Sequence, residues 1–289
     1  MMQTFRHPEK WRETIDPFAL HFHTFSLTEV LGYPHAGNDV FQVKGVLGGA
    51  ETAAYIKVAR RKDAAIENEV ALLRQLKSPV IPRLLDCDFG KHPYSVTSEM
   101  PGMRLSHILG GNENMDSLSY MEEYGAALAK IHAIKPDAQP VMDRKFFHVP
   151  SDEVLDRLNL GFLKKYFANS PTETFTVFCH GDFHYANLLW ENHHISAILD
   201  FELAGYGNRD YDIAWAIIRR PGQRFMKTKE EHDLFLKGYA SQGPFNEANI
   251  RYYMAQIYVY FMDANEEDTE YCEFVCSWLT ENCRHAARD

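Results

Sequence analysis

The sequence has few cysteines, no long apolar run and a shortage of basic residues. Its five cysteines do not show the spacing of a disulfide framework, so we expect free thiols and a cytoplasmic location. Residues 1–13 are polar and charged and contain Pro8, which does not resemble a secretory signal. Apolar stretches such as residues 213–218 are too short to span a bilayer, which argues against a membrane partner.

The charge balance is acidic, with 30 Lys and Arg against 40 Asp and Glu and a formal net charge of -10. This disfavours a nucleic-acid partner bound through a general basic surface. It suits a cationic partner. The 289 residues, 45% of them hydrophobic, can form one large domain or two lobes with a sizeable core. The ordinary contents of glycine and proline exclude a collagen-like or mainly disordered chain.

The pattern from residue 25 to residue 100 predicts strands and one helix. The β-like runs NDVFQVKG and ETAAYIKVA are separated by a glycine-rich turn at residues 45–49, which predicts a hairpin. A helix is expected from Asp63, a suitable N-cap, to Ser78, which precedes a proline. Two short strands are expected at residues 84–89 and 94–97.

Beyond Pro101 the chain is mainly helical, and apolar residues recur at helical spacing through SYMEEYGAALAKIHAI. One segment, TFTVFCHGDFHYANLLWENHHISAILDFE, interrupts the helices and predicts strand, loop, strand, turn and strand. The fold class is therefore α+β, with a small antiparallel-sheet lobe at residues 1–100 and a larger helical lobe at residues 101–289. Further helices are expected at residues 151–168, 211–219, 229–240, 247–262 and 270–284.

The interrupting segment carries a set of residues suited to phosphoryl transfer. Asp182 is followed by Asn187 and then by Asp200, which leaves an apolar strand. One aspartate can accept a hydroxyl proton while an amide and a second aspartate hold Mg²⁺ against nucleotide phosphates. Oxygen ligands of this kind are what Mg²⁺ prefers.

The first lobe supplies a lysine and a glutamate that fit the same chemistry. Lys57 ends the strand AAYIKV, which is close to the V-A-I-K signature. In the following helix Glu69 lies within the apolar arc, whereas Glu67 lies outside it. A carboxylate on a buried face usually has a partner, so we expect Glu69 to pair with Lys57.

These residues occur together in an order that resembles one known superfamily. Lys57, Glu69, HGDFHYANLLW and ILDFELAGYGNRDYDIAWA resemble the aminoglycoside phosphotransferase and choline kinase superfamily over most of the chain. The resemblance implies a bilobal, protein-kinase-like fold. It also implies ATP or GTP as co-substrate, Mg²⁺, and a small-molecule alcohol as phosphate acceptor.

The resemblance assigns roles to the residues of the interrupting segment. Asp182 resembles the catalytic base, and Asn187 and Asp200 resemble the Mg²⁺ ligands. His180 resembles the residue that shapes the catalytic loop, and Asp212 the helix aspartate that braces it.

Nucleotide contacts are implied in the first lobe. Lys57, paired with Glu69, resembles the lysine that contacts phosphate. Residues 98–100, which are Ser98, Glu99 and Met100, fall where the family's hinge bonds the adenine through backbone groups. Pro101 has no N–H, so the donors must come from those three residues or their neighbours.

Two departures from related kinases are informative. The loop expected to cover the phosphates, LGYPHAGNDV, lacks the full G-x-G-x-x-G motif, and we expect its backbone N–H groups around Gly37 and Asn38 to bind phosphate. Only twelve positions separate Asp200 from Asp212, which leaves no room for the activation segment of protein kinases. A small alcohol is therefore favoured over a protein substrate.

The acceptor is expected to be cationic. Glu202 resembles an acidic position in choline kinases and some aminoglycoside kinases, and residues 263–273 hold six acids and no base. A polycationic aminoglycoside could engage several of these acids. Choline or ethanolamine would need an aromatic cage, for which RYYMAQIYVYFM is a source. The alternatives are a solvated acidic face, another alcohol acceptor, or a non-catalytic nucleotide-binding module. The acids expected to contact the acceptor are Glu202, Asp263, Glu266, Glu267 and Glu270.

Overall fold

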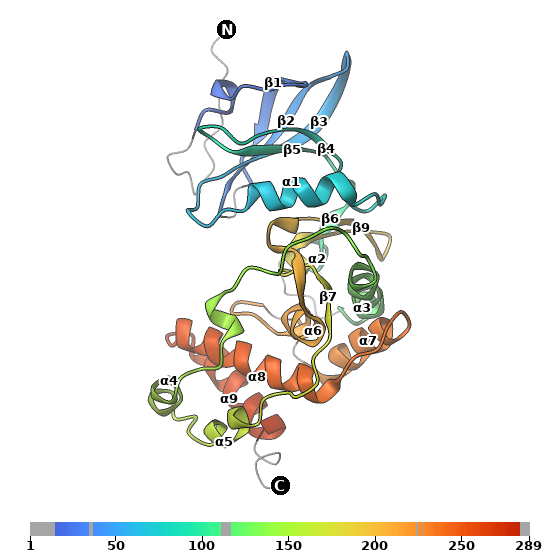
Figure 1. Cartoon of the computed structure of the whole chain (residues 1–289). Coiled ribbons are helices and arrows are strands. Elements are labelled where there is room, and N and C mark those ends of the chain that lie inside the picture. Colours follow the sequence, from blue (N-terminus) through green and yellow to red (C-terminus); the bar gives the residue numbers. More distant parts are fainter. Residues whose placement is uncertain (1–14, 35–36, 111–116, 224, 227, 284–289) are drawn as a thin grey trace.

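The computed structural model describes residues 15–34, 37–110, 117–223, 225–226 and 228–283. The N-terminal part of the chain forms a sheet with one helix beneath it, in the upper part of Figure 1. The rest of the chain forms a larger, mainly helical body below it. The predicted α+β fold class is confirmed. We propose residues 100 and 101 as the boundary between the two lobes. Among the described helices, none combines the length and the apolar character needed to cross a bilayer.

The N-terminal sheet has five antiparallel strands in the order β1-β2-β3-β5-β4. Alternate residues of β2 are buried, including Phe41 and Val43, and they form a core of their own with Ile56 and Val96 of the neighbouring strands. The β2–β3 hairpin turns at Gly48 and Gly49. Both residues have positive φ angles, which glycine adopts at little steric cost. The strands are β1 (Phe25–Gly32), β2 (Asp39–Leu47), β3 (Ala50–Val58), β4 (Leu84–Asp88) and β5 (Tyr94–Ser98).

Helix α1 (Ile66–Gln75) lies between this sheet and the C-terminal lobe (Figure 1). Its buried Leu72 and Leu73 belong to the large hydrophobic core of the C-terminal lobe and not to the core of the sheet. The expected start at Asp63 is wrong, because Ala65 occupies the N-cap position without a side-chain cap. The N–H of Ala65 instead donates to Glu202, 137 positions further along the chain.

The C-terminal lobe is built around the close pairs α3–α7 and α6–α8. Gly125 of α3 and Gly238 of α7 allow the two backbones to meet, since a Cβ at either position would clash with a carbonyl oxygen of the other helix. The helix expected at residues 151–168 is interrupted, because Asn159 adopts φ 57 and Gly161 follows it. The helices are α2 (Leu105–Ile108), α3 (Leu118–His132), α4 (Asp152–Arg157), α5 (Leu163–Ala168), α6 (Arg209–Ile217), α7 (Lys229–Ala240), α8 (Glu247–Ala264) and α9 (Thr269–Cys283), with short 3-10 turns η1 (Pro17–Ala19), η2 (Lys145–Phe147), η3 (Tyr185–Asn187) and η4 (Phe201–Leu203).

Two small sheets at the top of the C-terminal lobe position the catalytic segment. One has the order β6-β8-β9 and the other pairs β7 with β10. The β8–β9 hairpin turns at Asn192 and His193, both with positive φ. The catalytic loop therefore leaves β7 and enters β8, while Asp200 follows β9. These strands are β6 (Met103–Arg104), β7 (Thr176–Cys179), β8 (Leu188–Glu191), β9 (His194–Ile198) and β10 (Gly205–Asn208).

Candidate active site

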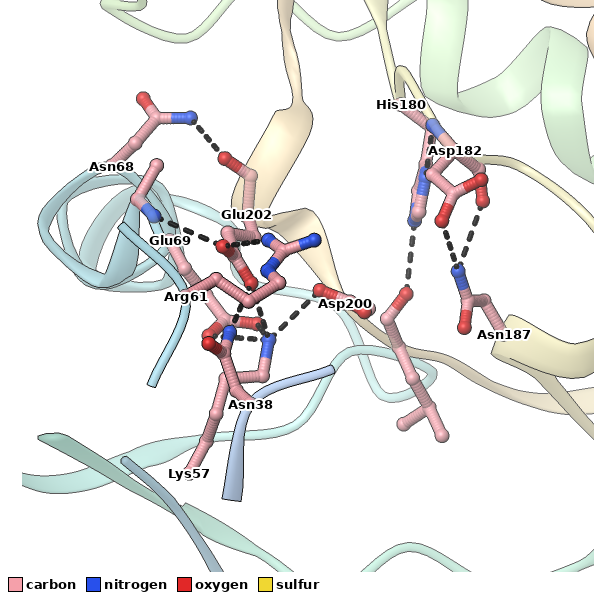
Figure 2. A network of polar contacts seen from close by, with 12 residues as sticks. Asn38, Lys57, Arg61, Asn68, Glu69, His180, Asp182, Asn187, Asp200 and Glu202 are labelled. Carbon is pink, nitrogen blue, oxygen red and sulfur yellow. Dashed lines mark hydrogen bonds and ion pairs between the residues drawn. The ribbon is translucent and has the colours of Figure 1, made fainter. Parts of the chain in front are cut away.

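Lys57 lies at the centre of a charged cluster between the lobes. Its Nζ is 3.0 Å from Oε1 of Glu69, 2.8 Å from Oδ1 of Asp200 and 3.5 Å from Oε2 of Glu202 (Figure 2). Burial favours the neutral amine, but the three carboxylates outweigh burial and raise the pKa of Lys57. Lys57 is therefore positively charged, and its ion pairs connect β3 to α1 and to the segment after β9.

Burial and charge act differently on two of these carboxylates. Burial raises the pKa of Glu69, and the nearby Lys57 offsets this only in part. Burial also opposes ionisation of Asp200, but the charge and the hydrogen bond of Lys57 outweigh burial and lower its pKa. Asp200 has φ 65, a left-handed conformation that aspartate adopts more readily than most residues. Its Oδ2 has no hydrogen-bond partner among the described residues, so this oxygen is open to a metal.

Glu202 links the two lobes and does not face a separate acceptor site. It is 4% exposed, and it accepts hydrogen bonds from Asn38 Nδ2 at 2.8 Å, Arg61 Nη2 at 2.6 Å and the N–H of Ala65 at 2.9 Å. All three donors come from the N-terminal lobe (Figure 2). The acceptor role expected for Glu202 does not fit this position, because cations and amides of the chain itself already satisfy the carboxylate.

Asp182 is held in the catalytic loop by three neighbours. Its Oδ1 accepts a hydrogen bond from Trp215 Nε1 at 2.9 Å, and its Oδ2 accepts one from Asn187 Nδ2 at 3.2 Å. Nε2 of His184 lies 3.6 Å from Oδ2. Burial opposes ionisation, but His184, the charge of Arg220 and the Trp215 bond outweigh it and hold the pKa of Asp182 well below its usual range. Asp182 is therefore an oriented carboxylate at neutral pH.

Asp212 braces the start of the loop from inside the lobe. Its two oxygens accept the backbone N–H groups of His180 at 3.0 Å and Gly181 at 3.1 Å. His132 of α3 bonds the same carboxylate at 3.0 Å and also contacts Tyr239 at 2.7 Å. Each polar group of this buried set has a partner, which fixes the backbone that carries Asp182.

His180 connects the loop that carries Asp182 to the strand that precedes Asp200. Nε2 of His180 bonds the carbonyl oxygen of Leu199 at 3.0 Å, next to Asp200. Burial lowers the pKa of His180 more than the surrounding acids raise it. A neutral imidazole therefore links the loop that carries Asp182 to the segment that carries Asp200 (Figure 2).

A cavity of about 870 Å³ lies between the lobes, and it brings the predicted nucleotide and metal residues together. At its hinge end the N–H of Ser98 donates to Arg83 and the N–H of Glu99 donates to Ala53. The N–H of Met100 has no acceptor among the described residues, which makes it the free hinge donor. The predicted site residues that line the cavity are Asn38, Lys57, Glu69, Ser98, Glu99, Met100, Asp182, Asn187, Asp200 and Glu202.

The loop expected to bind phosphate is only partly placed. Gly37 adopts φ 98, and Asn38 is 4% exposed with its side chain donating to Glu202. The side chain of Asn38 thus anchors the loop to the other lobe. Residues 35 and 36 lie outside the described residues.

Three of the six acids in the run at the end of α8 and the start of α9 contact arginines of the chain. Asp263 and Glu266 both contact Arg157 of α4, and Glu270 lies 3.0 Å from Arg219. Glu267 is exposed. None of these four acids lines the interlobe cavity. These four acids therefore lie outside the cavity that Asp182 lines, and two arginines compensate half of their charge.

Trp215 was not predicted as a site residue from the sequence, whereas Phe261 beside it belongs to the aromatic run RYYMAQIYVYFM that was considered as a cage. Phe146 of η2 stacks on Trp215 at 4.4 Å between ring centroids, and Phe261 of α8 stacks at 5.8 Å. Cζ of Arg220 lies 4.6 Å from the indole centroid. Trp215 is three positions after Asp212 in YDIAWA, so a helical reading of that motif places both side chains on the loop-facing side of α6.

Comparisons with known proteins agree with this geometry. A profile of the phosphotransferase enzyme family matches residues 34–245. Among solved structures, a thermostable mutant of aminoglycoside phosphotransferase APH(4)-Ia with ADP and hygromycin B shares 16% identity at a TM-score of 0.58, covering 90% of this chain and 94% of that one. The streptomycin–ATP complex of APH(2")-IIa shares 16% identity at a TM-score of 0.56, covering 90% and 93%.

A third solved structure extends the range of acceptors named among the similar folds. Macrolide 2'-phosphotransferase MphH from Brachybacterium faecium shares 17% identity at a TM-score of 0.51, covering 89% of this chain and 92% of that one. No curated protein sequence matches the chain. The family match covers well over half of the sequence, and the residues that first suggested a kinase-like enzyme meet in one cavity. The chain belongs to the phosphotransferase enzyme family, and it is a phosphotransferase with an alcohol group as acceptor.

Proposed function

We propose that the protein transfers the γ-phosphate of ATP or GTP to a hydroxyl group of a small molecule with the help of Mg²⁺. One observation carries this proposal: Lys57, Asp182, Asn187 and Asp200 converge on a single interlobe cavity in a chain of the phosphotransferase enzyme family. We propose the hinge residues 98–100 for the nucleobase, with the free N–H of Met100 as the donor.

The oxygens available in the cavity suit Mg²⁺. Asn187 uses its amide nitrogen on Asp182, which leaves its Oδ1 for a metal, and Asp200 uses Oδ1 on Lys57, which leaves Oδ2. A hard cation with few protein oxygens and several phosphate oxygens is the usual arrangement for Mg²⁺ in kinases. Bound there, the metal would neutralise charge on the nucleotide phosphates.

Asp182 is placed to act on the acceptor. It orients the hydroxyl and takes its proton while the hydroxyl oxygen forms a bond to the γ-phosphorus. The bond between that phosphorus and the oxygen bridging to the β-phosphate breaks, so the nucleoside diphosphate leaves. Lys57, held by Glu69, stabilises the negative charge that develops on the departing phosphates.

The test is Mg²⁺-dependent ADP release with a panel of alcohols, measured for the wild type and two variants. Asp182→Asn should keep nucleotide affinity and lower turnover by about 10²- to 10⁴-fold. Asp200→Asn should weaken Mg²⁺-dependent nucleotide binding. Asp137→Asn, an exposed carboxylate change, serves as the matched control. Full turnover in Asp182→Asn would reject the proposed base.

A cationic acceptor is the second candidate, and the solved relatives favour it. Solved structures of aminoglycoside phosphotransferases with a similar fold contain hygromycin B, streptomycin or gentamicin. In this chain, however, four of the five acids expected to receive such a ligand contact Arg61, Arg157 or Arg219, and only Glu267 does not. The panel should therefore contain amino, neutral and acidic alcohols together with choline and a macrolide.

A further inference from the structure

Arg144 is a cation of the cleft wall without an acidic partner in the described part of the chain. It lines the interlobe cavity together with Asp182 and Asn187. Its Nη2 is buried and has no hydrogen-bond partner among the described residues. A buried guanidinium N–H without an acceptor is unfavourable unless a ligand supplies one.

Other arginines in the structure show what is missing at this position. Five described guanidinium groups lie within ion-pair distance of a carboxylate. Arg144, in contrast, has no carboxylate within ion-pair distance among the described residues. It is the cavity-lining arginine nearest in sequence to Phe146, which stacks on Trp215. The five paired arginines are Arg60, Arg61, Arg157, Arg209 and Arg219.

The position of Arg144 places it on the acceptor side of the cleft. It lies two residues before Phe146, which stacks on Trp215, and Trp215 donates its N–H to Asp182. The connection from α3 to α4 that carries Arg144 crosses the top of the C-terminal lobe below α1 (Figure 1). The expected hinge residues Ser98, Glu99 and Met100 line the same cavity from the lobe boundary.

A second guanidinium makes the surroundings of Asp182 positive. Arg220 lies over the ring of Trp215 and has no carboxylate within ion-pair distance among residues 15–34, 37–110, 117–223, 225–226 and 228–283. Burial and the charge of Arg220 lower the pKa of the adjacent His184, which therefore adds no third charge at neutral pH. The charge of Arg220 therefore acts on Asp182, and Arg144 lines the same cavity as Asp182.

We infer that the acceptor carries an oxyanion, a carboxylate or a phosphate group, and that Arg144 binds it while Asp182 holds the reacting hydroxyl. This rests on the proposed function and names its substrate class. Arginine matches such groups with two parallel N–H donors, and these charge-assisted bonds are stronger than neutral ones. The charge of Arg220 favours the same anion. A polycation would meet Arg144 in the cavity, and four of its five expected acids, all except Glu267, already contact arginines of the chain.

The test is calorimetric titration of inorganic phosphate into the protein saturated with Mg·AMP-PNP. The analogue occupies the γ-phosphate position, so phosphate that binds in addition occupies a different site. Arg144→Gln should weaken phosphate binding at least about tenfold, or about 1.4 kcal/mol. Arg144→Lys keeps the charge and should restore part of the affinity. Arg251→Gln, the same change at an exposed arginine of α8, is the matched control and should bind phosphate like the wild type.

Three results would overturn the inference. These are no phosphate binding to the wild-type Mg·AMP-PNP complex, equal binding by Arg144→Gln, and Arg144-dependent binding seen only with Mg·ADP. The last result would mean that Arg144 contacts the transferred phosphate and not the acceptor. Tighter binding of glucosamine than of phosphate would likewise favour a cationic acceptor. Nucleotide binding is measured first, so its loss would reject the proposed function separately.

Discussion

Trp215 donates its indole N–H to Oδ1 of Asp182 at 2.9 Å, and this bond ties the aromatic residues around Trp215 to the carboxylate that we propose as the base. The indole ring stacks on Phe146, and the guanidinium group of Arg220 lies over the same ring. A shift of the aromatic wall would therefore change the direction of the carboxylate.

Replacement of Trp215 by phenylalanine tests this link. Trp215→Phe keeps an aromatic ring but removes the donor, so the pKa of Asp182 should rise and its orientation should loosen. We expect turnover to fall about tenfold with little change in nucleotide affinity, since one charge-assisted hydrogen bond contributes about 1.5–3 kcal/mol at most. Steady-state kinetics and nucleotide titration would measure both. Trp278→Phe, on α9 away from Asp182, is the control, and equal turnover in both variants would contradict the role of the bond.

Substitution of Glu202 tests the connection between the lobes. Glu202→Gln leaves an amide where the carboxylate binds Asn38, Arg61 and the N–H of Ala65, so it should destabilise the protein by about 1–3 kcal/mol and weaken nucleotide binding. Thermal unfolding and nucleotide titration would report the two effects. Glu67→Gln, an exposed change on α1, should have neither effect. If both variants behave alike, the connection is not important for stability.

Gly181 has a conformation and a position that exclude a side chain. It adopts φ 76, and a Cβ would lie 2.4 Å from the carbonyl oxygen of Leu203. Gly181→Ala should therefore push the catalytic loop away from η4, with a loss of turnover greater than that of stability. Gly222→Ala is a matched control, because Gly222 has φ 73 but open space around it. That change should cost only backbone strain, about 1 kcal/mol. Turnover and urea unfolding of both variants separate the clash from the strain.

Asp86 predicts a pH dependence of stability in the N-terminal lobe. Burial opposes its ionisation, but backbone N–H groups of residues 23–25 and Cys87 outweigh burial and lower its pKa from 3.8. A lowered folded pKa stabilises the fold above pH 3.8, and this contribution is lost as the pH falls toward the folded pKa.

Asp86→Asn should therefore be less stable than the wild type near pH 7, by about 1–3 kcal/mol. The difference should shrink as the pH falls below 4. Urea unfolding from pH 7 to pH 3 measures it, with Asp16→Asn near the start of the described chain as the control. A difference that stays constant over this range would show that the carboxylate charge is not the cause.

Local patterns were enough to predict much of the fold. The hairpin of β2 and β3, the strands near residues 84–98 and the helices of the C-terminal lobe follow alternation, helical spacing and turn residues that act within a few positions. The apolar arc of α1 likewise identified Glu69 over Glu67 as the buried acid.

Features that depend on distant contacts could not be predicted in this way. The start of α1 is set by Glu202 in place of Asp63, because the cap comes from another lobe. Asp263 pairs with Arg157, which lies far away in the sequence, so the acidic run alone could not reveal this partner. For that reason the run suggested a cationic ligand. Arg144 lies in an irregular connection, so neither a motif nor a period marks it.

The leucines of α1 decide which parts of the molecule move together when the cleft opens. Leu72 and Leu73 are packed in the core of the C-terminal lobe, whereas the sheet encloses its own core. The Lys57–Glu69 pair spans the boundary between the sheet and α1, so a displacement of the sheet relative to α1 would lengthen it. The distance between Lys57 and Glu69 thus reports whether the sheet packs against α1, because the ion pair forms only when the two are in contact.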